Sequence, residues 1–250
     1  MKTKHRHDLK ENDLARIVGA TREWIASHSQ HLTAASLALL IVAGAVFGLV
    51  TWRNQQQSRG QDLLAAAMVV MNTAVVPVTN TTTPGQAPAA AGIGATGTFT
   101  TEAQKLNAAL PKLRAAADAY PDTQAGITAR YHLASTLASL GKPKDAIAQF
   151  DEVAKRAGPD SLYGQMAQLG KADAQAQAGE VDAAIAAWKE LAAKKAANLP
   201  EDAILMGLAR AYQAKGNIAE ARKTFTQIVD DHPDSPYVAD ARKELDSLKS

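Results

Sequence analysis

The longest apolar stretch of the chain lies near its N-terminus. No Asp, Glu, Lys or Arg occurs between Trp24 and Trp52, and residues 32–52 consist mainly of Leu, Ala, Val, Ile and Gly. About 20 apolar residues are needed to cross the core of a bilayer as a helix. Tryptophan is common at both membrane interfaces. The pattern therefore predicts a transmembrane helix over residues 32–52.

The charges on the two sides of this span predict its orientation. Residues 1–31 carry six Lys and Arg side chains, whereas only Arg53 and Arg59 follow the span before a long uncharged stretch. Because an excess of Lys and Arg marks the cytoplasmic side, we expect residues 1–31 in the cytoplasm and the rest of the chain outside it. A cleaved signal peptide is the alternative, but its charged region would be unusually long and no A-x-A cleavage site follows the apolar run.

Two features near the span bear on lipid contact and self-association. The apolar residues of segment 12–30 fall largely on one stripe, which predicts a short amphipathic helix. This helix either lies on the membrane surface or only leads into the span. Gly44 and Gly48 form a G-x-x-x-G pair that would let two helices approach closely, as in a homodimer. The alternative is that glycine is simply common in membrane helices.

Residues 63–101, which carry no charge, precede the C-terminal part of the chain. Residues 53–76 are expected to continue as a helix leading from the membrane. Residues 77–101 are rich in Thr, Pro, Gly and Ala without any period, which predicts a flexible insert. The insert contains a G-x-G-x-x-G match at residues 92–97, but a dinucleotide site requires this motif between a strand and a helix. No cofactor is therefore expected.

An internal repeat marks residues 102–250. Three glycines lie 38 and 37 residues apart, and each is followed by Ala after five residues and by a large aromatic after nine. A glycine ends a helix by adopting the left-handed conformation, so each copy is predicted to be a hairpin of two helices. One hairpin cannot bury its apolar face alone, so the hairpins should stack into a solenoid. The glycines and their aromatics are Gly141 with Phe150, Gly179 with Trp188, and Gly216 with Phe225.

Composition supports the same fold and excludes several functions. Abundant Ala and only 5% aromatic residues favour helix over sheet. We therefore predict an all-α chain: one N-terminal transmembrane helix, then a solenoid of about three to four helical hairpins with a C-terminal capping helix from Ser235 to Leu248. The absence of cysteine excludes disulfides and thiol catalysis. With a net charge of +2 and no basic block, nucleic-acid binding is not expected.

The sequence offers no constellation of catalytic or metal-binding residues. Two pairs of closely spaced histidines near the N-terminus lack the further ligands that a metal site needs. Gly170-Lys171 is followed by Ala172, not by Ser or Thr, so it is not a P-loop. We therefore predict no catalytic, cofactor-binding or metal-binding residues, and expect a protein that is not an enzyme.

The spacing of Gly, Ala, aromatic and Pro in the repeats resembles the tetratricopeptide repeat. His-Pro-Asp at residues 232–234 ends a hairpin, and Tyr-Pro-Asp-Thr at residues 120–123 echoes it. The layout of a basic N-terminus, one span ending in Trp-Arg and degenerate repeats is similar to the ancillary subunit of the bacterial Sec translocon. That resemblance implies a single-pass inner-membrane protein with a periplasmic repeat domain at residues 102–250. Its implied partners are the Sec translocon, periplasmic chaperones or exported clients.

The first helices of the hairpins are expected to line the concave side of the solenoid. Their mix of aromatic, Met, acidic and basic side chains suits a peptide or a partner segment, although ordinary solvated helix faces are the alternative. The predicted function is a scaffold linking the Sec translocon to chaperones or clients, and a scaffold for cell-envelope assembly or cell division is the second hypothesis. The predicted groove positions are Tyr131, Ser135, Leu169, Asp173, Met206, Arg210 and Gln213.

Overall fold

The computed structural model describes residues 29–76, 98–194 and 199–248, with side chains from Ala38 onward. These residues are helical apart from turns and one isolated bridge, so the predicted all-α fold is confirmed. The predicted amphipathic helix at 12–30 and most of the predicted insert lie outside the described residues. The helices are α2 (Ser29–Met71), α3 (Glu102–Ala119), α4 (Gln124–Ser139), α5 (Pro143–Ala157), α6 (Leu162–Gln177), α7 (Val181–Ala193), α8 (Glu201–Ala214), α9 (Ile218–Asp231) and α10 (Val238–Ser247).

The chain divides into two compact units, Met1–Gln55 and Gln56–Ser250, and the boundary falls within α2. In the first unit the large apolar side chains of α2 are exposed, with Leu39 at 70% and Phe47 at 71%. One helical segment, Ala38–Met71, is long and apolar enough to cross a membrane. Apolar surface of this extent is unfavourable in water and favourable in hydrocarbon, so the first unit has the properties expected of the predicted span.

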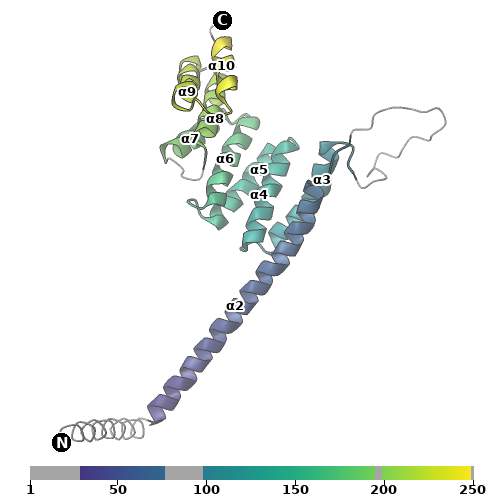
Figure 1. Ribbon diagram of the computed structural model, residues 1–250, viewed down its shortest axis with the longest axis vertical. Coiled ribbons are helices and arrows are strands. Elements are labelled where there is room, and N and C mark those ends of the chain that lie inside the picture. Colours follow the sequence, from purple (N-terminus) through teal and green to yellow (C-terminus); the bar gives the residue numbers. More distant parts are fainter. Residues whose placement is uncertain (1–28, 77–97, 195–198, 249–250) are drawn as a thin grey trace, which may run out of the picture. The chain divides into compact units, whose positions relative to one another are not determined.

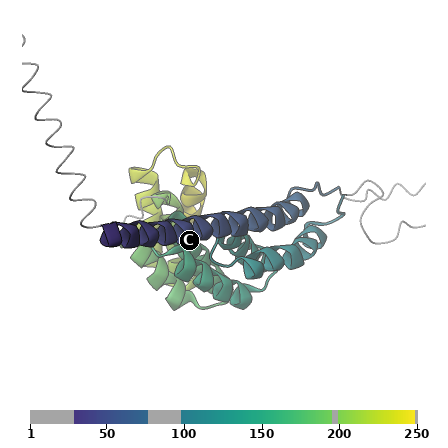
Figure 2. The ribbon, with the colours of Figure 1, turned by 90° about the horizontal axis from the view of Figure 1, so that it is seen from below.

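Helical hairpins follow one another through the second unit (Figures 1 and 2). Helix α4 pairs with α5, α6 with α7 and α8 with α9, while α10 packs on α9 as the predicted cap. Consecutive first helices also contact each other, α4 with α6 and α6 with α8. The second helices α5, α7 and α9 have no comparable mutual contact within the described residues. The first helices therefore lie on the inner side of the solenoid's curve.

The three predicted glycine turns are confirmed. Gly141, Gly179 and Gly216 follow the first helix of each hairpin with φ angles of 71°, 80° and 80°. The residue after each glycine donates its N–H to the carbonyl five residues back, as Lys142 does to Leu137 at 2.9 Å. This bond satisfies a carbonyl at the helix end, and only glycine adopts the required φ without strain.

The first hairpin differs from the prediction at its turn. Helix α2 ends at Met71, before the predicted end at Val76. Val75 instead forms an isolated parallel bridge with Phe99: the Val76 N–H donates to the Phe99 carbonyl at 2.8 Å. Valine favours extended backbone, and Phe99 is buried to 9% exposure. The last residues predicted to be insert therefore belong to the folded unit.

The end of α2 serves as a first helix in the repeat series. The Gln124 N–H, at the start of α4, donates to Gln57 Oε1 at 3.3 Å. Near the other end of α4, Thr136 Oγ1 lies 4.0 Å from Met71 Sδ. The last part of α2 thus runs parallel to α4 and completes a hairpin with α3. The compact second unit begins at Gln56, so the end of α2 packs together with the predicted repeat domain at residues 102–250.

Candidate functional site

Neighbouring hairpins pack together along contacts that we call seams. At two of these seams an aromatic ring of one hairpin meets a glycine of the next. Phe150 and Trp188 are each 3% exposed. A Cβ atom on Gly170 would lie 2.5 Å from the Phe150 ring, and one on Gly207 would lie 2.7 Å from the Trp188 indole. The prediction that these aromatics are core residues is confirmed. Their glycine partners, 20 and 19 residues downstream, are a signal in the sequence that the prediction did not use.

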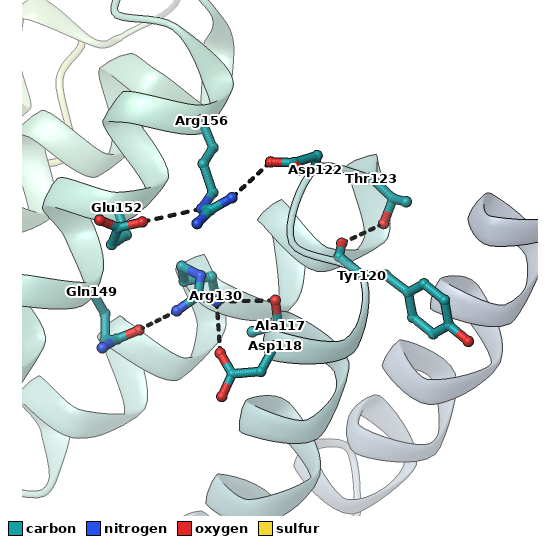
Figure 3. Close-up of polar contacts among 9 residues, drawn as sticks. All are labelled: Ala117, Asp118, Tyr120, Asp122, Thr123, Arg130, Gln149, Glu152 and Arg156. Carbon is teal, nitrogen blue, oxygen red and sulfur yellow. Dashed lines mark hydrogen bonds and ion pairs between the residues drawn. The ribbon is translucent and has the colours of Figure 1, made fainter. Parts of the chain in front are cut away.

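A Pro-Asp-Thr or Pro-Asp-Ser turn introduces α4 and α6. Thr123 Oγ1 donates to the Tyr120 carbonyl at 2.8 Å and accepts from the Gly126 N–H at 3.1 Å (Figure 3). Ser161 makes the same two contacts one repeat later, at 2.9 and 3.0 Å. Each hydroxyl satisfies an N–H that the helix start leaves free. The sequence interpretation identified the first of these turns but missed the copy at residues 158–161.

A buried arginine joins the first two hairpins. Arg130 of α4 is 8% exposed and donates to Gln149 at 2.8 Å, to Asp118 at 2.7 Å and to an α3 carbonyl at 3.0 Å (Figure 3). On the exposed side Arg156 pairs with Asp122 at 2.7 Å. These contacts engage most of the Arg130 donors, although its Nε has no partner within the described residues. We interpret the cluster as a structural link and not as a binding site.

The predicted groove residues of α4 pack against their own neighbours. The Tyr131 ring meets Phe150 and Tyr163 edge to face, with ring centroids 5.8 Å apart in both pairs. The Ser135 hydroxyl donates to the Tyr131 carbonyl at 3.1 Å. Burial raises the pKa of the Tyr131 phenol. Tyr131 therefore fixes α4 to α5 and α6 and leaves only part of its surface for a partner.

Met206 lies in the core, so its predicted place in the groove is wrong. Its side chain is 2% exposed and lies in the core with Phe225, where an unbranched thioether fills space between helices. Leu169, at the equivalent position of α6, is partly buried against the cluster around Trp188. Positions ten residues before each turn glycine thus face the seams, whereas Asp173 and Arg210, six residues before it, face outward.

The groove residues of α8 contact the capping helix. Arg210 Nη2 lies 3.3 Å from Asp240 of α10, and Gln213 donates to Glu244 at 3.1 Å. Helix α10 thus lies beside α8 as the first helix of a further hairpin would. The Arg210 and Asp240 side chains are 52% and 61% exposed. An ion pair this exposed contributes less than about 1 kcal/mol, so it orients Arg210 more than it stabilises the fold.

A pocket of about 490 Å³ opens between α6, α7 and α8. It brings together two of the predicted groove residues, Asp173 and Arg210. The remaining lining comes from small or apolar positions of all three helices, including the second helix α7, which the groove prediction left out. We call this feature the α6–α8 pocket; its other lining residues are Ala176, Gln177, Val181, Trp188, Gly207, Ala211 and Ala214.

Asp173 is the unusual group of the α6–α8 pocket. Its carboxylate has no hydrogen bond or ion pair with any residue that the structure describes. The side chain reaches solvent at the pocket mouth, but the protein atoms around it raise the pKa of Asp173 by desolvation to about 6. Placing an unpaired carboxylate in such surroundings costs free energy unless a positive or donor group joins it.

Replacing Asp173 with asparagine should stabilise the folded chain at neutral pH. The pKa of Asp173 is raised in the fold, so the carboxylate destabilises the folded state above about pH 6, and the penalty disappears as both states become protonated below pH 4. We expect Asp173→Asn to gain about 1 kcal/mol at pH 7.5, allowing for solvent screening, and nothing at pH 3.5. Urea unfolding of both chains at the two pH values measures this, and an equal difference at both would contradict it.

Within the described residues no group of three His, Asp or Glu side chains could hold a metal ion. The expected absence of metal, cofactor and catalytic residues stays a prediction.

The hairpins are similar to repeats of known proteins. Two tetratricopeptide-repeat family models match, one at residues 102–161 and 131–203 and the other at residues 176–245. Solved structures of nearly identical TPR-like repeats from a candidate kinesin light chain of Podosopora anserina, native and with a single substitution, are also similar. They share 20% and 19% identity with TM-scores of 0.50 and 0.51, covering 58% of this chain and 77% of those chains. No curated protein sequence matches the chain.

Proposed function

We propose, because residues 102–245 of this chain are tetratricopeptide repeats, that the protein is a membrane-anchored scaffold whose inner face binds segments of other proteins. Arrays of such repeats present extended concave surfaces and are generally interaction scaffolds without enzymatic activity. The observation that carries the proposal is the α6–α8 pocket, which lies between first helices and combines an apolar floor with opposite charges.

The anchor is part of the proposal. Its support is the exposed apolar surface of α2 in the first unit, together with the excess of Lys and Arg before the span. The proposed orientation places the N-terminus in the cytoplasm and the repeats in the periplasm of a bacterial cell. A reporter fused after residue 60 tests this orientation, and activity only in the cytoplasm would contradict it.

A role in protein export is a further part of the proposal. The resemblance of the layout to the ancillary Sec subunit supports a scaffold that links the Sec translocon to periplasmic chaperones or to exported clients. Affinity capture of the intact membrane protein tests this role. Recovery of Sec components or chaperones supports it, whereas recovery of division or outer-membrane assembly proteins without them favours the second hypothesis.

Site-specific photo-crosslinking tests whether the inner face binds. A photoreactive amino acid is placed at Ser135, Asp173 or Arg210 in the full chain, and cross-linked polypeptides are identified after irradiation of intact cells. We expect adducts from these three sites and not from the exposed control positions on the second helices, which are Lys155, Lys189 and Gln227.

Two outcomes would contradict the proposed scaffold role. Adducts that form equally from both sets of positions would show that the inner face has no special function. Adducts from the second helices alone would place the interaction surface on the opposite side of the solenoid.

A further inference from the structure

We propose that the α6–α8 pocket binds a cationic side chain, lysine or arginine, that is flanked by an apolar side chain in an exposed segment of a protein partner. The inference rests on the proposed scaffold function and adds the chemistry of the segment that the scaffold recognises. Three observations carry it: the charges at the pocket, its apolar lining, and the contrast with the equivalent place one hairpin earlier.

The charges leave one carboxylate of the pocket without a counterion. Arg210 is held by Asp240 at 3.3 Å. Asp173 has no hydrogen bond or ion pair to any described residue, so the local balance of these three groups is one negative charge. A cation that enters the pocket would meet, at the pocket mouth, a carboxylate with no competing counterion among the described residues.

Two lysines on or beside the helices of the pocket are engaged with other carboxylates. Lys171 of α6 pairs with Asp151 at 2.6 Å, and Lys215 pairs with Asp182 of α7. These pairs keep the chain's own cations on other carboxylates. Asp173 has no counterion among the described residues, so a cation of a partner can supply one.

The lining of the pocket suits an apolar neighbour of that cation. Three alanines, Val181 and Trp188 are among its lining residues. Its volume of about 490 Å³ lies within the range of pockets that hold small ligands, so one or two side chains fit. Alanine side chains are apolar and form no hydrogen bonds. They therefore favour contact with aliphatic groups, such as leucine or the methylene chain of lysine.

The equivalent place between α4 and α6 has different chemistry. The residue that corresponds to Asp173 is Ser135, whose hydroxyl is already bonded to the Tyr131 carbonyl. The Tyr131 ring packs against Phe150 and Tyr163 there. A carboxylate without a partner thus distinguishes the place between α6 and α8 from the place between α4 and α6.

Peptide binding to the full chain in detergent micelles tests the inference. Three fluorescein-labelled peptides are identical except for one central residue between leucines, which is lysine, glutamine or glutamate. Fluorescence anisotropy at pH 7.5 gives each Kd. We expect the lysine peptide to bind about fivefold more tightly than the glutamine peptide, the effect of one partly exposed ion pair, with the glutamate peptide weakest.

Asp173→Asn keeps the shape of the side chain and removes its charge. We expect this variant to bind the lysine and glutamine peptides with Kd values within about twofold of each other, because the ion pair is gone. The matched control is Asp230→Asn, which removes an exposed carboxylate from α9 outside the pocket and should keep the lysine preference.

Equal Kd values for all three peptides, no detectable binding of any peptide, or a lysine preference that survives Asp173→Asn would overturn the inference. Failure here is distinguishable from failure of the scaffold proposal. Photo-adducts at the inner face without a lysine preference leave the scaffold role intact. A lysine preference without photo-adducts would remove the scaffold role and leave the chemistry of the pocket.

Discussion

Phe225→Ala should cost the C-terminal hairpin about 3–5 kcal/mol, the largest effect that we expect from a single substitution in this chain. Phe225 is 0% exposed and lies among residues of α8, α9 and α10. Removing the ring leaves a cavity at the last seam of the solenoid. Helix α10 has one fully buried residue of its own, Ala241, so it has little else to hold it in place.

The loss should remain local, because repeats are stabilised mainly by their immediate neighbours. Hydrogen exchange followed by mass spectrometry on the full chain would then show faster exchange in α9 and α10, with little change in α4 and α5. The control is Phe225→Leu, which keeps most of the apolar volume and should cost about 1 kcal/mol. Uniformly faster exchange throughout the repeats would contradict the expected local effect.

Gly126→Ala should destabilise the start of α4 by about 2 kcal/mol, although alanine is the better helix former by about 1 kcal/mol. A Cβ atom at this position would lie 1.9 Å from the carbonyl oxygen of Tyr120. That oxygen accepts the Thr123 hydroxyl bond and belongs to the backbone, so it cannot rotate away as a side chain would. The helix start has to shift, and the hydroxyl cap is weakened with it.

Thermal unfolding of the purified full chain, followed by circular dichroism, measures this effect. At about 2–4 °C per kcal/mol, the midpoint should fall by roughly 4–8 °C. Gly44→Ala is the matched control, since a Cβ atom there meets nothing within 4 Å. A Gly126→Ala midpoint equal to that of Gly44→Ala would show that the turn adapts at no cost.

The third copy of the turn supports this interpretation of Gly126. At residues 232–235 the same Pro-Asp-Ser pattern occurs, but Val238 stands where the first two copies have glycine. The Ser235 hydroxyl accepts there from the Tyr237 N–H at 3.0 Å and donates to Asp202 at 2.6 Å. Helix α10 begins only at Val238, so the turn that contains a side chain at this position adopts a different cap.

Much of the fold could be predicted from local sequence patterns. A turn glycine with positive φ depends on its own backbone, so Gly141, Gly179 and Gly216 could be recognised from spacing alone. The first hairpin could not be recognised in this way. It has a bridge and an insert in place of the turn glycine, and its first helix continues from an apolar span. The groove was predicted in part: the stripe through Asp173 and Arg210 faces outward, whereas Met206 faces the core.

Asp173 and Arg210 were predicted as groove positions, but the α6–α8 pocket that brings them together could not be predicted from the sequence. Whether Asp173 finds a cation depends on how α6, α7 and α8 are spaced, and on Asp240 of the capping helix holding Arg210. The Arg210–Asp240 pair joins residues 30 positions apart, and the pocket lining runs from Asp173 to Ala214, so the periodicity of a single helix does not contain these contacts. The charge and shape of this pocket thus depend on contacts between helices of different repeats.

The bridge between Val75 and Phe99 holds together two points of the chain that lie 24 positions apart in the sequence. The entropy lost in closing a loop grows only with the logarithm of its length, so doubling the loop costs about 0.6 kcal/mol. Insertions, deletions and fused domains at this point should leave the repeats in register. A further domain could therefore be inserted between Val75 and Phe99 without a change in the packing of the solenoid.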